Sequence, residues 1–171
     1  MKGKSVAIRQ ARRLLSLMEI DSENIDVKRK ISNAIDVEDI AKRLDINVVY
    51  QDFESDISGV FFRKNNHLFL GVNKTHHPNR QRFTIAHEIG HYILHSSELL
   101  HYDTGELHFR KDDVSGLDEV EANHFAAELL MPAGMVNKCI ESGVRVISDL
   151  ADRFGVSEDA MRYRLINLGW L

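Results

Sequence analysis

The sequence predicts an α+β protein, mostly helical, with a small antiparallel sheet of about three strands packed beside a histidine-rich helix. Apolar residues recur at helical spacing near both ends of the chain, and runs rich in β-branched and aromatic residues lie between them. At 171 residues the chain is long enough for one substantial domain. Helices, then strands, then helices again are typical of the α+β class.

The first element is predicted to be an amphipathic surface helix. Its apolar residues fall at helical spacing: Ala7, Ala11, Leu14, Leu15 and Met18. The first twenty residues are also basic, yet no apolar run of about 7–15 residues follows, as a signal peptide would require. We assign residues 1–30 to an N-terminal helical extension.

The segment from residue 36 to residue 73 is predicted to contain a helix followed by strands. DVEDIAKRL, residues 36–44, places its apolar residues on one helical face behind an acidic first turn. INVVYQDF, residues 46–53, is predicted to be a strand. ISGVFFRKNNHLFLGVN, residues 57–73, is predicted to be a hairpin with its turn at Lys64, Asn65 and Asn66.

The histidine-rich segment RFTIAHEIGHYILH, residues 82–95, is predicted to lie in a helix. This helix should begin near Asn79 or Arg80, directly after Pro78. Residues 96–117 contain glycines and mixed charges without clear periodicity, so we predict a long loop. The length and position of this loop make it a candidate lid over a cleft.

Helices are predicted again in the last third of the chain. DEVEANHFAAELLMP, residues 118–132, should be helical up to its proline. Residues 133–171 should form two or three short helices divided by Gly143 and Gly155, in a helix-turn-helix-like pattern. We therefore divide the chain into the extension, a core at residues 31–132, and C-terminal helices that pack on this core.

The composition limits the class of protein. A net charge of -4 argues against a surface built wholly for nucleic acid. No run approaches the roughly 18 apolar residues that a membrane span needs. Cys139 is the only cysteine and cannot form an internal disulfide, which fits a reducing compartment. We predict a soluble cytoplasmic protein with no membrane partner.

The motif HExxH lies on the histidine-rich helix as His87, Glu88 and His91. The two histidines are separated by about 6 Å along the axis and share a face, so their imidazole nitrogens can converge on one tetrahedral zinc ion. Glu88 lies about 100° round the helix from His87, where it can act as a general base. The alternative is a helix that is merely rich in histidine, which predicts no bound metal.

A zinc site of this kind needs a third protein ligand. His95 lies about 12 Å beyond His87 along the axis, so a straight helix cannot bring both to one ion. We predict instead that His95 supports the site, contacts the substrate or lies at the surface. The downstream helix offers four carboxylates: Asp118, Glu119, Glu121 and Glu128.

Helical geometry favours Glu119 among these carboxylates. Glu119 shares a face with Asn123 and with two alanines, which would let this helix pack closely on the one with the histidine pair. Asn123 could accept the other ring N–H of a histidine ligand. Glu121 is the next candidate, and an ordinary surface glutamate near a helix N-terminus is the alternative for Glu119.

Two segments, RQRFTIAHEIGHYILH and EVEANHFAAELLMP, together closely resemble the ImmA/IrrE family of gluzincin-like zinc metallopeptidases. The likeness covers roughly residues 30–171, and it makes residues 31–132 a zinc-peptidase core. By position, it implies a zinc ion held by His87, His91 and Glu119, with Glu88 as the catalytic base. It does not assign the group that stabilises the oxyanion, for which the predicted loop offers Tyr102, His101 and His108.

The resemblance also implies a function. We expect a zinc-dependent endopeptidase whose protein substrate is a helix-turn-helix transcriptional repressor, cleaved as an anti-repressor step in phage, mobile-element or stress regulation. One alternative is a non-proteolytic regulatory protein that binds a repressor or DNA. Another is a partner in a toxin–antitoxin system.

The C-terminal residues 146–169 also look like a DNA-binding helix-turn-helix, with Arg162, Tyr163 and Arg164 on the second helix. A recognition helix is expected to lie in a basic surface, but nearby acidic residues largely offset these arginines. We therefore expect the tail to pack on the core through Val156, Met161 and Leu165, and DNA binding remains the alternative.

Overall fold

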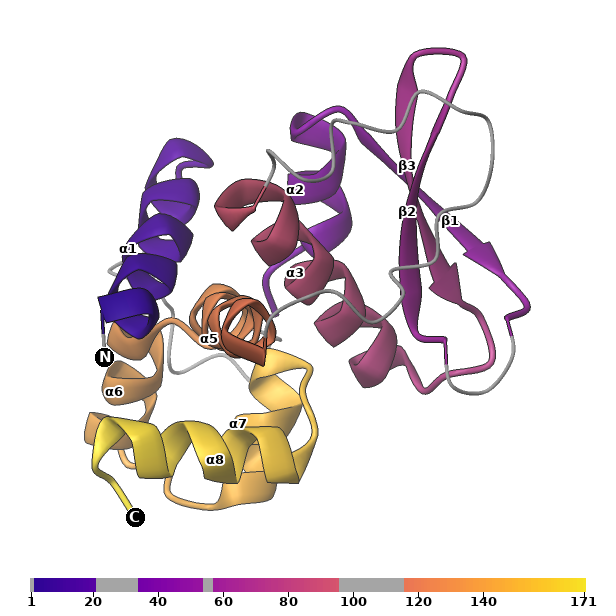
Figure 1. Cartoon of the computed structure of the whole chain (residues 1–171). Helices are drawn as coiled ribbons and strands as arrows, with labels where there is room; N and C mark the ends of the chain where they lie inside the picture. The colour runs from indigo at the N-terminus through magenta and orange to yellow at the C-terminus, as the bar shows by residue number, and fades with distance from the viewer. Residues whose placement is uncertain (1, 21–33, 54–56, 96–115) are drawn as a thin grey trace.

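The computed structural model describes residues 2–20, 34–53, 57–95 and 116–171. Helix α3 (Pro78–Leu94) lies between a three-stranded sheet on one side and the helix pair α1 (Lys2–Leu17) and α5 (Gly116–Leu130) on the other (Figure 1). Helix α2 (Val37–Arg43) packs against both α3 and the sheet. The α+β prediction is confirmed, and α3 is central to the layers.

The sheet consists of β1 (Ile46–Gln51), β2 (Gly59–Lys64) and β3 (His67–Asn73), in the order β1-β3-β2. Strands β2 and β3 form the predicted antiparallel hairpin. Its turn residues, Asn65 and Asn66, have φ of 49° and 63°. Two-residue hairpin loops of this kind need positive φ at both positions, which asparagine tolerates better than most residues.

The sheet is mixed, and our prediction of an antiparallel sheet is wrong for one of its two pairs. Strand β1 pairs with β3 in parallel, so β3 lies between β1 and β2. The burial of β3 explains this arrangement. Four consecutive residues, Leu70 to Asn73, are buried, and a strand buried on both faces belongs in the middle of a sheet.

Helix α1 belongs to the same core as the rest of the chain. Four residues of its predicted apolar stripe are buried, Ala7, Ala11, Leu14 and Leu15, whereas Met18 is half-buried. The helix packs along α5. Buried residues of α1, the sheet, α3, α5 and the C-terminal helices form one hydrophobic cluster. This cluster includes residues from both sides of positions 30 and 132. The division of the chain at these two positions stays a prediction.

The C-terminal part folds as three short helices: α6 (Ala133–Glu141), α7 (Ile147–Phe154) and α8 (Glu158–Leu168). Helix α7 ends at Gly155, whose φ of 61° is left-handed, and Ser157 caps α8 by accepting a hydrogen bond from the Ala160 N–H. Val156, Met161 and Leu165 are buried, and they belong to the same hydrophobic cluster as the buried residues of α3 and α5.

A buried ion pair joins α8 to α5 and α1. Arg164 contacts Glu128 and donates to the Met131 carbonyl at 2.9 Å, while Arg12 lies 2.8 Å from the other Glu128 oxygen. Arg164 is 5% exposed. One of the three residues of the predicted DNA-reading helix is thus enclosed, whereas Arg162 and Tyr163 are exposed.

None of the helices in the described ranges has the length and apolarity needed to cross a membrane.

Candidate metal centre

The two histidines of the HExxH motif meet on the face of α3 that packs against α5. Nε2 of His87 lies 3.0 Å from Nε2 of His91, as expected for residues one helical turn apart. His91 is fully buried, and the His87 side chain is 15% exposed. The pair therefore lies at the boundary between the core and a solvent-accessible cleft.

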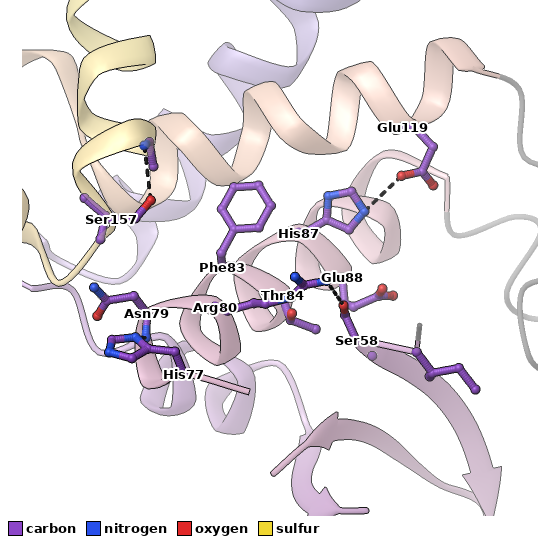
Figure 2. A pocket seen from close by; sticks show the side chains of 14 residues that line it. Ser58, His77, Asn79, Arg80, Phe83, Thr84, His87, Glu88, Glu119 and Ser157 are labelled. Atoms are coloured by element: carbon purple, nitrogen blue, oxygen red, sulfur yellow. Dashed lines mark hydrogen bonds and ion pairs between the residues drawn. The ribbon is translucent and has the colours of Figure 1, made fainter. Parts of the chain in front are cut away.

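Glu119, in the first turn of α5, lies opposite this pair. One of its carboxylate oxygens is 3.2 Å from Nε2 of His87, and the other is 3.1 Å from Nε2 of His91 (Figure 2 shows the contact with His87). His87, His91 and Glu119 thus form a group whose possible ligand atoms converge. Of the four candidate carboxylates, Glu119 is the one that the fold brings to the histidine pair.

The donor atoms of this group fit a zinc ion. Nδ1 of His87 lies 3.1 Å from Oδ1 of Asn123; an amide oxygen only accepts, so Nδ1 carries the hydrogen and Nε2 a lone pair. Neighbouring ligands of a tetrahedral zinc ion are about 3.4 Å apart, close to the separations found here. Two imidazoles and one carboxylate are also an established ligand set of catalytic zinc.

Small residues between α3 and α5 make this convergence possible. A Cβ atom on Gly90, inside the HExxH motif, would lie 3.0 Å from Cδ1 of Phe125 on α5. Ala122 and Ala126, on the face of α5 that carries Glu119, are fully buried. The helices can therefore approach closely enough for a carboxylate of one to reach the histidines of the other, as the predicted alanine face required.

Glu88 lies on a different face of α3, beside the first residue of β2. A Cβ atom on Gly59 would lie 2.5 Å from Cγ2 of Thr84 and 3.3 Å from Cγ of Glu88. Only glycine leaves room for the strand to pass so close to the helix. Gly59 was not among the residues predicted to shape the site, although a glycine inside a strand pattern often indicates a close backbone approach.

A cavity of about 770 Å³ opens beside the histidine pair (Figure 2). It extends from the candidate metal-binding group along α3 to the N-terminal turn of α8, and the start of β2 also lines it. Glu88 and Glu119 line it at one end. Its other lining residues are Ile57, Ser58, Gly59, His77, Asn79, Arg80, Phe83, Thr84, His87, Val156, Ser157 and Ala160.

His95 does not join the histidine pair in this group. Its ring nitrogens lie 3.7 Å from an Asp118 oxygen and 3.8 Å from a Glu121 oxygen, so it forms a separate cluster next to the first. Helical geometry had excluded His95 as a ligand of the same ion, and its position agrees. The candidates for oxyanion stabilisation, His101, Tyr102 and His108, lie outside the described residues. So does most of the predicted lid at residues 96–117, whose last two residues instead begin α5.

Comparison with known protein families adds an independent observation. The model of the IrrE N-terminal-like domain, a peptidase family designated M78, matches residues 41–166. The chain belongs to this family. The family match includes the HExxH helix, α5 and most of the C-terminal helices, so this IrrE N-terminal-like domain contains every residue of the candidate metal centre.

Individual relatives of this IrrE N-terminal-like chain include two named radiation response metalloprotease IrrE. The protein from Deinococcus radiodurans is 34% identical over 103 residues, and that from Deinococcus deserti is 35% identical over 104 residues. Each match covers 58% of this chain, but only 31% and 36% of the respective relative. The chain thus spans about a third of the length of these two relatives.

A third relative matches over most of both sequences. Uncharacterized immunity region protein 2 of Bacillus phage phi105 is 27% identical over 123 residues, which is 72% of this chain and 73% of the phage protein. Among solved structures, a Mycobacterium tuberculosis transcriptional regulator matches 94% of this chain and 46% of its own, with a TM-score of 0.61 and 19% identity. The latter likeness supports the fold alone.

Proposed function

We propose that this chain is a zinc-dependent endopeptidase in which His87, His91 and Glu119 hold the metal and Glu88 is the general base. The observation that carries the proposal is the convergence of the three ligand side chains at the end of a cavity that Glu88 also lines. Membership in a peptidase family supports it. A cavity of about 770 Å³ is large enough for several side chains of an extended peptide.

The residues divide the chemistry of peptide hydrolysis between them. When bound, zinc would supply Lewis-acid chemistry, which makes water more acidic and a carbonyl carbon more electrophilic. Glu88 would accept the proton of the attacking water as the new C–O bond forms. It would then return that proton to the amide nitrogen as the C–N bond breaks, so the protons balance. Asn123 would hold the His87 ring in orientation through its 3.1 Å contact with Nδ1.

Replacement of the general base tests this mechanism. Glu88→Gln keeps the size of the side chain but removes its basicity, so the variant should retain bound zinc and lose peptide cleavage by at least about 100-fold. Zinc content is measured by elemental analysis and cleavage by mass spectrometry. Glu141→Gln, on an exposed residue of α6, is the matched control and should cleave normally. Cleavage by Glu88→Gln at the wild-type rate would exclude the mechanism.

For the substrate, we propose a helix-turn-helix transcriptional repressor, cleaved in an anti-repressor role. The name of the phage phi105 relative, which refers to an immunity region, supports a regulatory role of this kind. The direct test is incubation of the zinc-loaded protein with the repressor encoded beside its gene, followed by mass spectrometry of the products. A repressor that binds and stays intact would favour the non-proteolytic alternative. We also propose a cytoplasmic location, which the free, buried Cys139 supports.

A further inference from the structure

Charged residues of both signs line the cavity. At the metal-binding end it is lined by the carboxylates of Glu88 and Glu119. Arg80 also lines it, together with the N-cap residue His77 and Asn79 of the first turn of α3. The acidic residues Glu158 and Asp159 of α8 are exposed and do not line the cavity. Among the described residues that line this space, Arg80 is the one arginine or lysine.

The side chain of Arg80 extends along α3 toward Ser58 and Glu88 (Figure 2). Its Nη2 donates to Oγ of Ser58 at 2.9 Å, and Ser58 precedes the glycine that lies against Glu88. Arg80, Thr84 and Glu88 follow one another at intervals of four residues, so they share one face of the helix. The guanidinium is thus held beside the path of a peptide that reaches the metal-binding end.

Most of the hydrogen-bonding capacity of Arg80 is available to a ligand. A guanidinium has five N–H donors in a planar fork, and Ser58 accepts from one of them. In the part of the chain that the structure describes, no carboxylate forms an ion pair with Arg80. The other walls near it are apolar or small, including Ile57, Phe83 and Ala160. Arg80 is exposed, so its remaining donors are open to a ligand, and a guanidinium fork matches a carboxylate.

We infer that Arg80 determines specificity by binding a carboxylate of the peptide substrate, an inference that rests on the proposed peptidase function. Arg80 lies eight residues from Glu88, about 12 Å along the helix axis, and its side chain covers part of that distance. An extended peptide advances about 3.3 Å per residue, so the bound carboxylate lies about one to three residues from the scissile bond. The carboxylate belongs to an acidic side chain or to the peptide C-terminus.

Quenched fluorescent peptide pools distinguish these two sources. One set carries Glu or Gln at a single fixed position, with random neutral residues elsewhere and an amidated C-terminus. A second set has neutral residues throughout and ends in a free carboxylate or an amide. With wild-type protein and zinc, we expect kcat/KM to be at least about tenfold higher for the acidic member of one pair. The pair that shows the preference identifies the source of the carboxylate.

Variants at position 80 then test the assignment. Arg80→Gln should abolish the preference, whereas Arg80→Glu should reverse it toward a Lys-containing pool. Arg162→Gln, which removes an exposed arginine outside the cavity, should preserve it. A preference retained in Arg80→Gln would overturn the inference. An equal fall in kcat for acidic and neutral pools would also overturn it, because it would indicate contact with the reacting carbonyl instead.

A binding measurement separates failure of this inference from failure of the proposed function. Glu88→Gln and the double variant Glu88→Gln/Arg80→Gln are titrated with the same pools by fluorescence anisotropy, which needs no turnover. Tighter binding of the acidic pool by about tenfold in the single variant, lost in the double variant, supports the role of Arg80 even if the wild type cleaves nothing. Equal binding of acidic and neutral pools contradicts it, whether or not the wild type is a peptidase.

Discussion

Nδ1 of His87 lies 3.1 Å from Oδ1 of Asn123, so an amide on α5 orients a histidine ring on α3. Because the amide oxygen can only accept, the contact keeps the hydrogen on Nδ1 and directs the lone pair of Nε2 toward His91 and Glu119. The tautomer of one candidate ligand is thus set by the helix that supplies another. Asn123 and Glu119 are one helical turn apart, so a single element provides both contacts.

Replacement of Asn123 should weaken metal binding without unfolding the protein. Asn123→Ala removes the acceptor for the His87 N–H, and we expect the affinity for zinc to fall about 10- to 100-fold. Competition with a chelating dye measures this change. Asn123→Asp keeps an acceptor at the same position and should retain most of the affinity. An unchanged affinity in the alanine variant would show that other contacts hold the ring.

The choice of third ligand is tested by two neighbouring glutamates. Glu119→Ala should reduce bound zinc to well below one ion per chain, because a catalytic zinc site needs three protein ligands. Glu121→Ala, two residues away and directed toward His95, should bind zinc as the wild type does. Elemental analysis after dialysis against a weak chelator gives both stoichiometries. If the Glu121 variant alone lost the metal, our assignment would be wrong.

The close approach of β2 to α3 predicts a steric effect at Gly59. Gly59→Ala places a methyl group 2.5 Å from Cγ2 of Thr84, so the strand must shift, at a cost of about 1–3 kcal/mol in unfolding free energy. The melting temperature and cleavage should fall together, since Glu88 lies beside the same strand. Thr84→Ser removes the clashing methyl group and should recover much of the loss in a double variant. A Cβ atom on Gly116 would have no neighbouring atom within 4 Å, so Gly116→Ala is the control.

The buried pair of Glu128 and Arg164 should be important for stability. Arg164→Met leaves a carboxylate that is 2% exposed without its buried partner, which should cost about 3–5 kcal/mol. In the double variant Glu128→Met/Arg164→Met, much of this loss should disappear, because no buried charge remains. Arg12→Ala removes a contact made from a side chain that is 60% exposed, so we expect a loss of at most about 1 kcal/mol. Urea denaturation measures the unfolding free energy of each of these three variants.

Acid should destabilise the protein partly through His124. Burial lowers the pKa of this histidine, and the charges of Lys4 and Arg164 lower it further. The unfolded chain then takes up a proton near pH 6.5, whereas the folded state takes it up only at lower pH. Stability should therefore fall as the pH decreases through about 6.5, and less so in His124→Gln. Equal pH dependence of the unfolding free energy in both proteins would contradict this assignment.

Several elements could be predicted from local periodicity and turn chemistry alone. The apolar stripe of α1, the two asparagines of the hairpin and the HExxH spacing are local patterns, and each has the predicted structure. The candidate for the third ligand was also within reach of sequence reasoning. A helix face with two alanines beside Glu119 indicated which carboxylate could approach the histidines, because close helix packing needs small residues.

Long-range packing, in contrast, sets which strands are neighbours and which residues line the cavity. Strand β1 pairs with β3 in parallel, and β3 is buried over Leu70 to Asn73; both features involve segments that are distant in the sequence. Gly59, Arg80 and the first turn of α8 come from three separate parts of the chain, and packing alone places them around one space. Spacing along a helix fixes which side chains share a face, but long-range packing fixes what that face meets.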